Sequence, residues 1–152
     1  SVFGQTNVQV IWQCGKSYEQ ELATFQSTLP ANVKVFAFIQ RMDLAYALST
    51  VIISRAGALS VSELALVAIP TILVPSPNVA EDHQTKNARA LVDRAAAVLV
   101  TDAQASEKLV TTALDLLSDV AQQQELSVTL KSFALPNATK AIVEVCLNSA
   151  KL

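Results

Sequence analysis

Apolar and polar positions along the chain alternate between two kinds of segment. Short runs rich in β-branched and other apolar residues predict strands at 8–14, 33–38, 51–54, 71–75 and 97–100. Between these runs, apolar residues recur at steps of three and four and predict helices at 17–25, 43–48, 60–67 and 82–94. Because strands and helices alternate, we expect parallel pairing through right-handed crossovers. The pattern therefore predicts an α/β fold with an open, doubly wound parallel sheet covered by helices on both faces.

The last third of the chain has helical periodicity only. Apolar stripes at 109–117 and 126–133 predict two helices, and Pro136 with Asn137 opens a last one. We expect Ile142, Val145 and Cys146 of this last helix to face inward. No internal repeat, linker or low-complexity stretch separates the segments, so the 152 residues are expected to form one domain.

Composition narrows the class of protein. Apolar residues make up 51% of the chain, yet the longest apolar runs, at 71–75 and 95–100, are far too short to cross a bilayer. Residues 1–10 lack the basic patch and apolar stretch of a signal peptide. The net charge is −2 with acids and bases interleaved, which argues against a nucleic-acid partner. Cys14 and Cys146 fit neither a metal site nor a disulfide framework, and they are interpreted as reduced core residues of a cytosolic protein.

In doubly wound sheets, ligands bind beyond the carboxyl ends of the strands. The loop after the third predicted strand starts with Arg55, continues through three small residues and leads into a helix. Small residues let a ligand approach the backbone, Gly57 can adopt a positive φ, and the N–H groups of a first helical turn favour a phosphate. The loop is neither a Walker A motif nor a G-x-G-x-x-G fingerprint.

One residue pair and one single residue in this region keep alternative interpretations. Ser60 and Glu63 have the spacing of a capping box, which satisfies a helix start without any ligand. A carboxylate such as Glu63 can also accept both hydroxyls of a ribose. Arg55 is either half of a surface ion pair or a clamp for an anion.

The loop after the fourth predicted strand carries the only histidine of the chain. His83, Gln84 and Asn87 gather imidazole and amide groups near a helix start, and such groups suit the hydroxyls of a sugar. A lone histidine at a helix start is also commonly structural. Neither a Ser–His–Asp triad nor a metal site can be assembled around His83 from the residues nearby.

The two loops together resemble one known family. They read ISRAGALSVSE at 53–63 and IPTILVPSPNVAEDHQTKNA at 69–88, and they are similar to the donor-binding domain of the MurG family of glycosyltransferases. The resemblance runs from about residue 8 to the end of the chain. It implies the carboxyl-terminal, Rossmann-like domain of a GT-B enzyme that transfers N-acetylglucosamine from UDP-N-acetylglucosamine to lipid I, forming lipid II for peptidoglycan.

The resemblance also implies which residues bind the donor. The main chain of Ile39 would meet the uracil, and Arg55 would lie beside the nucleotide. The backbone of Ala58, Leu59 and Ser60 would hold the diphosphate, Glu63 the ribose hydroxyls, and His83 and Gln84 the sugar. No catalytic residue, metal or cofactor is implied for residues 1–152.

The sequence departs from the family pattern at several places. Ala68 and Ile69 stand where the family usually has Gly-Lys, and Thr50 stands where an aspartate is common. These positions lie outside the expected contacts. A glycine-rich loop with a serine, which follows the first strand in the family, has no counterpart. We therefore expect a fragment that starts one strand–helix unit late and lacks the acceptor domain, so that strands 8–14 and 51–54 lose a shared neighbour. Either those two strands pair in a new way or a homodimer lends a strand.

The expected partners are UDP-N-acetylglucosamine and, through the missing amino-terminal domain, a lipid-linked acceptor. The expected location is cytoplasmic, with the parent enzyme peripheral on the cytoplasmic face of the inner membrane. Two other functions stay open: the small subunit of a transferase for dolichol-linked glycans, and a non-catalytic UDP-sugar binding module.

Overall fold

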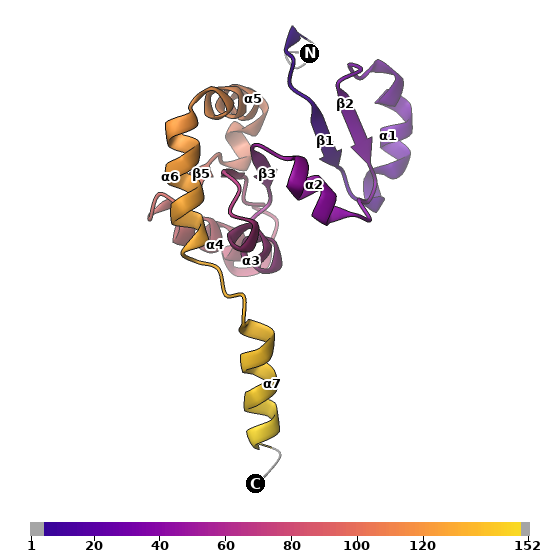
Figure 1. The fold of residues 1–152 in the computed structure, drawn as a ribbon. Coiled ribbons are helices and arrows are strands. Elements are labelled where there is room, and N and C mark those ends of the chain that lie inside the picture. Colours follow the sequence, from indigo (N-terminus) through magenta and orange to yellow (C-terminus); the bar gives the residue numbers. More distant parts are fainter. Residues whose placement is uncertain (1–4, 150–152) are drawn as a thin grey trace. The chain divides into compact units, whose positions relative to one another are not determined.

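The computed structural model describes residues 5–149, and its elements follow the predicted alternation (Figure 1). The strands in this range are β1 Val10–Gln13, β2 Val33–Phe36, β3 Ile52–Ser54, β4 Thr71–Leu73 and β5 Val98–Leu99. The α-helices in it are α1 Glu19–Phe25, α2 Met42–Leu48, α3 Ala58–Val67, α4 His83–Val92, α5 Asp102–Ser118, α6 Val120–Lys131 and α7 Ala138–Ser149. Short 3-10 segments are η2 Lys16–Tyr18, η3 Gln26–Thr28 and η4 Ala80–Asp82.

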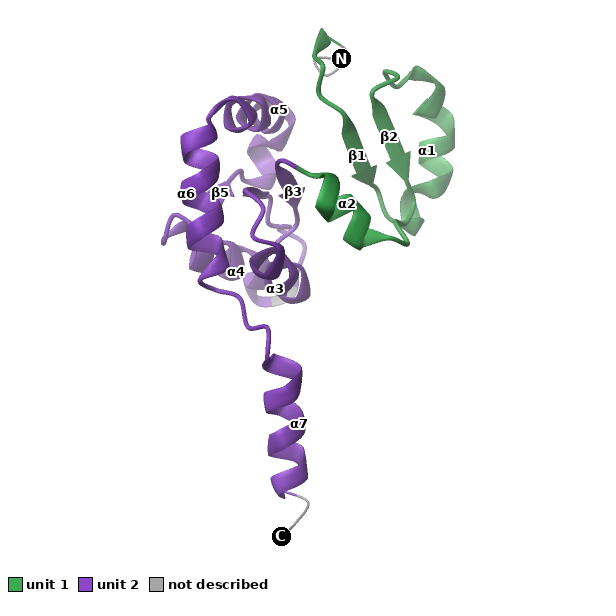
Figure 2. Ribbon diagram, viewed as in Figure 1, with its two compact units in different colours: residues 1–49 green, residues 50–152 purple. Residues whose placement is uncertain are grey.

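Every strand pairing in the described range is parallel, which confirms the α/β class. The expected single open sheet is wrong, however, because the described strands form two sheets, β1-β2 and β3-β4-β5. The chain divides accordingly into two compact units, Ser1–Ser49 and Thr50–Leu152 (Figure 2). No ladder joins β1 to β3 in this part of the chain, so the direct pairing considered above does not form.

Unit 1 is small and has a thin core. Among its described residues, Leu22 of α1 and Val35 of β2 are the buried apolar ones, and the ring of Trp12 stacks on Phe25 with centroids 6.4 Å apart. Ile11 on β1 stays 46% exposed. A sheet of two strands has too little surface to bury both of its faces under one short helix.

Unit 2 holds the larger core, centred on β4. Ile72 and Leu73 in β4 have no exposed surface, as is usual for a strand covered on both sides. Ile72 packs with Leu116 of α5 and Leu126 of α6, while Leu73 points to the opposite face. The middle strand is therefore the most buried strand of this sheet, and the loop at its carboxyl end extends directly from the core.

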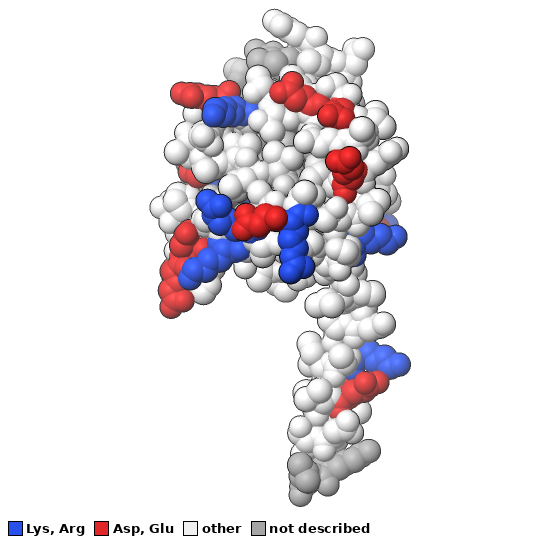
Figure 3. Space-filling model, turned by 90° about the vertical axis from the view of Figure 1, so that its left-hand side faces the viewer, with Lys and Arg blue, Asp and Glu red and all other residues white. Residues whose placement is uncertain are grey.

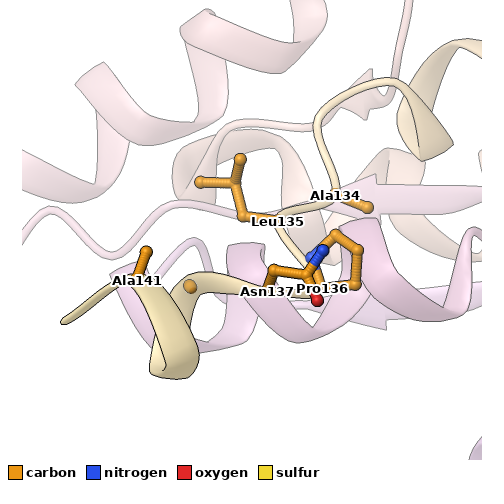
Figure 4. A pocket seen from close by; sticks show the side chains of 6 residues that line it. Ala134, Leu135, Pro136, Asn137 and Ala141 are labelled. Carbon is orange, nitrogen blue, oxygen red and sulfur yellow. The ribbon is translucent and has the colours of Figure 1, made fainter. Parts of the chain in front are cut away.

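Helix α7 forms where predicted, but its orientation was predicted wrongly. Ile142 and Val145 are 64% and 65% exposed, and Cys146 is exposed as well. No residue of α7 is buried by the described chain, so its apolar stripe lacks a surface to pack on. The cysteines are accordingly not core residues: both are free, and Cys14 is only half-buried. Figure 4 shows a shallow hollow at the entry to α7, lined by Ala134, Leu135, Pro136, Asn137, Ala138 and Ala141.

The end of α3 shows how alanine is accommodated at Ala68, where the family usually has glycine. Ala68, the residue that ends the helix, has φ 53° and ψ 35° in the left-handed region. Glycine adopts this conformation without steric cost, which is why helices commonly end on it. Ala68 is held there by two bonds: its N–H donates to the carbonyl of Leu64, and its own carbonyl accepts from the hydroxyl of Ser127.

The distribution of surface charge and the lengths of the apolar segments agree with what the sequence predicts. Acidic and basic side chains are interspersed on the face shown in Figure 3, with no extended basic patch. Among residues 5–149, no helix is long and apolar enough to cross a membrane.

Candidate functional site

Two loops meet at the carboxyl ends of β3 and β4. The strands run parallel, with Ser54 opposite Leu73, so both chains leave the sheet at the same edge. One loop leads into α3 and the other leads through η4 into α4. Seven of the eight predicted binding residues lie on these loops and helices in unit 2, whereas Ile39 belongs to unit 1.

The amino-terminal end of α3 presents backbone N–H groups that the helix itself does not use. The helix begins at Ala58 with Gly57 as its capping residue, two residues earlier than predicted. Ser60 is thus the third helical residue, and the capping-box interpretation of Ser60 and Glu63 is wrong. Gly57 has no side chain with which to cap the helix, so the N–H groups of its first turn, those of Ala58, Leu59 and Ser60, lack a partner within the helix. Gly57 has φ −64° and does not use the positive φ that glycine permits.

A pair of amides on α4 ties the two loops together. The Oε1 atom of Gln84 accepts the N–H of Ala56 at 3.2 Å and the N–H of Ser76 at 2.9 Å. The Nδ2 group of Asn87 donates to the carbonyl of Ala56 at 3.0 Å. Ala56 itself has no exposed surface. Asn87 was noted in the sequence but given no binding role. The sequence feature that could have indicated its role is its spacing of three residues from Gln84, which places both side chains on one face of the helix.

Arg55 forms the surface ion pair that one of its two interpretations expected. Its Nη1 group donates to the carbonyl of Val74 at 3.2 Å and forms an ion pair with Asp102, the first residue of α5. The Arg55 side chain nevertheless remains 55% exposed. An exposed ion pair contributes about 1 kcal/mol or less, so it leaves Arg55 able to contact an anion as well. Sequence reasoning missed Asp102; an acid in the first turn of the helix after β5 was the available signal.

The remaining unit 2 residues lie on α3 and α4. Glu63 is exposed on α3, one turn beyond these N–H groups of the helix start. His83 opens α4, and its Nε2 atom is 3.6 Å from Oε2 of Glu81. Glu81 and Asp82 have φ 53° and 54°, a left-handed pair of non-glycine residues. Such strain in successive residues is concentrated at functional turns.

In unit 1, the main-chain N–H of Ile39 already has a side-chain partner. Its N–H donates to Oε1 of Gln13 at 2.8 Å. A pyrimidine that uses this donor would have to replace the Gln13 amide oxygen. Sequence reasoning did not single out Gln13.

A serine at Gly57 tests whether the start of α3 binds an anion, because it is expected to raise stability and to weaken any diphosphate binding at this helix start. Its hydroxyl would cap α3, adding a few tenths of a kcal/mol to the free energy of unfolding. If the helix start binds the diphosphate that the family resemblance implies, the same hydroxyl would occupy one of the N–H groups for that anion, and UDP affinity is expected to fall by about twofold to tenfold. Calorimetric titration and thermal denaturation measure the two effects.

Gly57→Ala is the matched control for that experiment. A Cβ at Gly57 lies in ordinary contact with Ser60 Oγ at 3.6 Å, so both variants share this contact and only serine adds a cap. Equal UDP affinity of the two variants, with the serine variant more stable, would show that these N–H groups do not bind the diphosphate.

Comparison with known proteins places the chain among glycosyltransferases. Residues 2–142 match the sequence model of the glycosyltransferase family 28 C-terminal domain. A UDP-N-acetylglucosamine–N-acetylmuramyl-(pentapeptide) pyrophosphoryl-undecaprenol N-acetylglucosamine transferase of Flavobacterium psychrophilum is 51% identical over 91% of the chain and 37% of its own length. The Cytophaga hutchinsonii protein of the same name is 52% identical over 90% of the chain and 36% of its own length.

Solved structures agree. The structure of Acinetobacter baumannii MurG is 31% identical, with a TM-score of 0.76 over 94% of this chain and 42% of that protein. A glycosyltransferase of kitacinnamycin, 21% identical with a TM-score of 0.71 over 94% of this chain and 36% of its own, shares the fold. The chain spans little more than a third of the length of the curated relatives cited.

Proposed function

The chain belongs to the glycosyltransferase family 28 C-terminal domains, and from this premise we propose its function. It is the donor-binding part of an enzyme that transfers N-acetylglucosamine from UDP-N-acetylglucosamine to lipid I, forming lipid II. The observation that carries the proposal is the uncapped first turn of α3, set beside a second loop that bears His83 and Gln84. Relatives about 50% identical carry the name of this transferase.

The proposed contacts follow the parts of the donor. The N–H groups at the start of α3 hold the diphosphate, because a helix start favours negative charge. Glu63 accepts the ribose hydroxyls and Arg55 lies beside the nucleotide. His83 and Gln84 contact the sugar, and the main chain of Ile39 contacts the uracil.

The proposed reaction is an inverting displacement. An acceptor hydroxyl attacks the anomeric carbon, that carbon's bond to the diphosphate oxygen breaks, and UDP leaves. Charge builds up on the leaving diphosphate, where the N–H groups of Ala58, Leu59 and Ser60 stabilise it. Residues 1–152 supply no catalytic base in this proposal; that group and the contacts to the lipid-linked acceptor belong to another domain of the enzyme.

We place the parent enzyme on the cytoplasmic face of the inner membrane as a peripheral protein. The relatives' names specify an undecaprenol-linked acceptor, which is a lipid, and a nucleotide sugar, which is soluble. An enzyme that joins the two has to work at a membrane surface.

The chain is expected to bind UDP-N-acetylglucosamine at least about tenfold more tightly than ADP-glucose, because a site built to hydrogen-bond one base rejects another. Ligand-observed NMR measures both affinities on the same sample. The absolute affinity is expected to be weak. Equal binding of the adenine nucleotide would remove the assignment of a uracil site to Ile39.

We also propose that the chain forms a homodimer through its strand edges. Within residues 5–149, β1 pairs only with β2 and β3 pairs only with β4, so each leaves an unpaired edge. Apolar side chains lie on these strands half-exposed: Ile11 at 46%, Trp12 at 45% and Ile53 at 44%. Unpaired edges with apolar neighbours are templates for another strand.

Sedimentation velocity is expected to show a dimer at low micromolar concentration. An added charge on an edge strand opposes edge-to-edge pairing. Ile53→Lys is therefore expected to shift the chain toward monomer. A wild-type chain that sediments as a monomer across the whole concentration range would contradict this proposal and leave the donor-binding proposal untouched.

A further inference from the structure

Ala56 has both of its main-chain polar groups held by side chains of one helix. The N–H of Ala56 is bound by Gln84 and its carbonyl by Asn87, both on α4. Ala56 is completely buried and comes immediately before Gly57, the capping residue of α3. The position of the first turn of α3 therefore depends on two amides located 28 and 31 residues further along the chain.

We infer that Asn87 is a positioning residue for the diphosphate: by holding the carbonyl of Ala56, it aims the N–H groups of Ala58, Leu59 and Ser60 at the anion. This inference rests on the proposed function. Asn87 itself contacts only protein in this arrangement. Its effect passes through Ala56 and Gly57, which connect β3 to α3.

Gln84 makes the arrangement stricter. Its Oε1 atom accepts two N–H groups, one from each loop, so the carbonyl side of the amide is fixed and the NH₂ side is left to donate. Asn87 uses the opposite part of its own amide, donating an N–H to the other polar group of Ala56. Together the two amides bind both the N–H and the carbonyl of Ala56, and neither amide binds both.

A residue that positions the start of α3 and a residue that only stabilises the fold differ in how their loss changes ligand affinities. Misplacing the start of α3 affects a ligand that carries a diphosphate and spares one that lacks it. UDP and uridine differ in the diphosphate alone, so the ratio of their affinities reports on the position of these N–H groups. A loss of overall stability changes both affinities together.

The test uses ¹⁵N-labelled chain titrated with UDP and with uridine. Asn87→Ala is expected to lower UDP affinity about tenfold, the effect of one lost hydrogen bond to a buried group, and to leave uridine affinity within about twofold. Asn87→Asp keeps the size of the side chain but sets a carboxylate against a carbonyl, and it is expected to lower UDP affinity further. Asn148→Ala, which removes an exposed amide from α7, is the matched control and is expected to change neither affinity.

Amide exchange supplies a readout that needs no ligand. In Asn87→Ala and Asn87→Asp, the N–H of Ala56 is expected to exchange faster than in the wild type, because the loop is then held by Gln84 alone and opens more often. Gln84→Glu keeps an acceptor for both N–H groups and loses its donors, so Ala56 exchange is expected to stay slow.

The outcomes separate the two proposals. Unchanged Ala56 exchange, or equal losses of UDP and uridine affinity in the Asn87 variants, would overturn the positioning role. A wild-type chain that binds neither UDP nor uridine would overturn the proposed function, and the exchange measurement would still decide whether Asn87 positions the loop.

Discussion

Glu63→Gln is expected to lower UDP affinity by about 10-fold to 150-fold, which corresponds to a lost charge-assisted hydrogen bond of about 1.5–3 kcal/mol. A carboxylate accepts both hydroxyls of a ribose, whereas an amide has only one acceptor oxygen. The structure separates this role from helix capping: α3 starts at Ala58, and Glu63 is its sixth residue. Because Glu63 is exposed and does not start the helix, the free energy of unfolding is expected to change less than the free energy of UDP binding.

Calorimetric titration with UDP and thermal denaturation test both parts of this prediction. Glu107→Gln removes another exposed carboxylate, from α5, and serves as the control for the change in net charge. If Glu63→Gln lowered the melting temperature strongly and left UDP affinity intact, Glu63 would have a structural role and its assignment to the ribose would be wrong.

Ile72→Ala is expected to have the largest effect on stability, lowering the free energy of unfolding by about 2–5 kcal/mol. Ile72 has no exposed surface and lies in β4, the middle strand of the unit 2 sheet, where it packs on α5 and α6. The alanine would leave a cavity between the sheet and these helices. Because β4 also carries the loop that Gln84 holds at Ser76, UDP binding should be lost wherever this unit unfolds.

Urea denaturation measures this change, and Ile142→Ala is the matched control. Ile142 is the same residue type, but it lies on α7 and is 64% exposed. Its replacement is expected to cost less than about half as much, because less apolar surface is removed from contact. Equal losses for the two variants would mean that β4 is not the centre of the core.

Much of the fold and of the candidate site followed from the sequence by itself. Each predicted strand and helix exists within residues 5–149, with most ends shifted by a few residues and the starts of α5 and α6 shifted by more. Local periodicity is sufficient for this, because a strand or helix shows its buried positions at a regular spacing. The same local pattern located the two loops, since small and polar residues directly after an apolar run mark the carboxyl end of a strand.

Only the tertiary structure decided which elements meet. The division into two sheets, the exposure of α7 and the pairings of Arg55 with Asp102 and of Ala56 with Asn87 all depend on residues distant in the chain. The helix start at Ala58 is of the same kind, because Ala56, just ahead of it, is held by side chains of α4. Periodicity states that a face is apolar, but it does not state which surface covers that face. Such contacts are set by long-range packing and by the balance of buried hydrogen bonds, and neither leaves a regular pattern in the sequence.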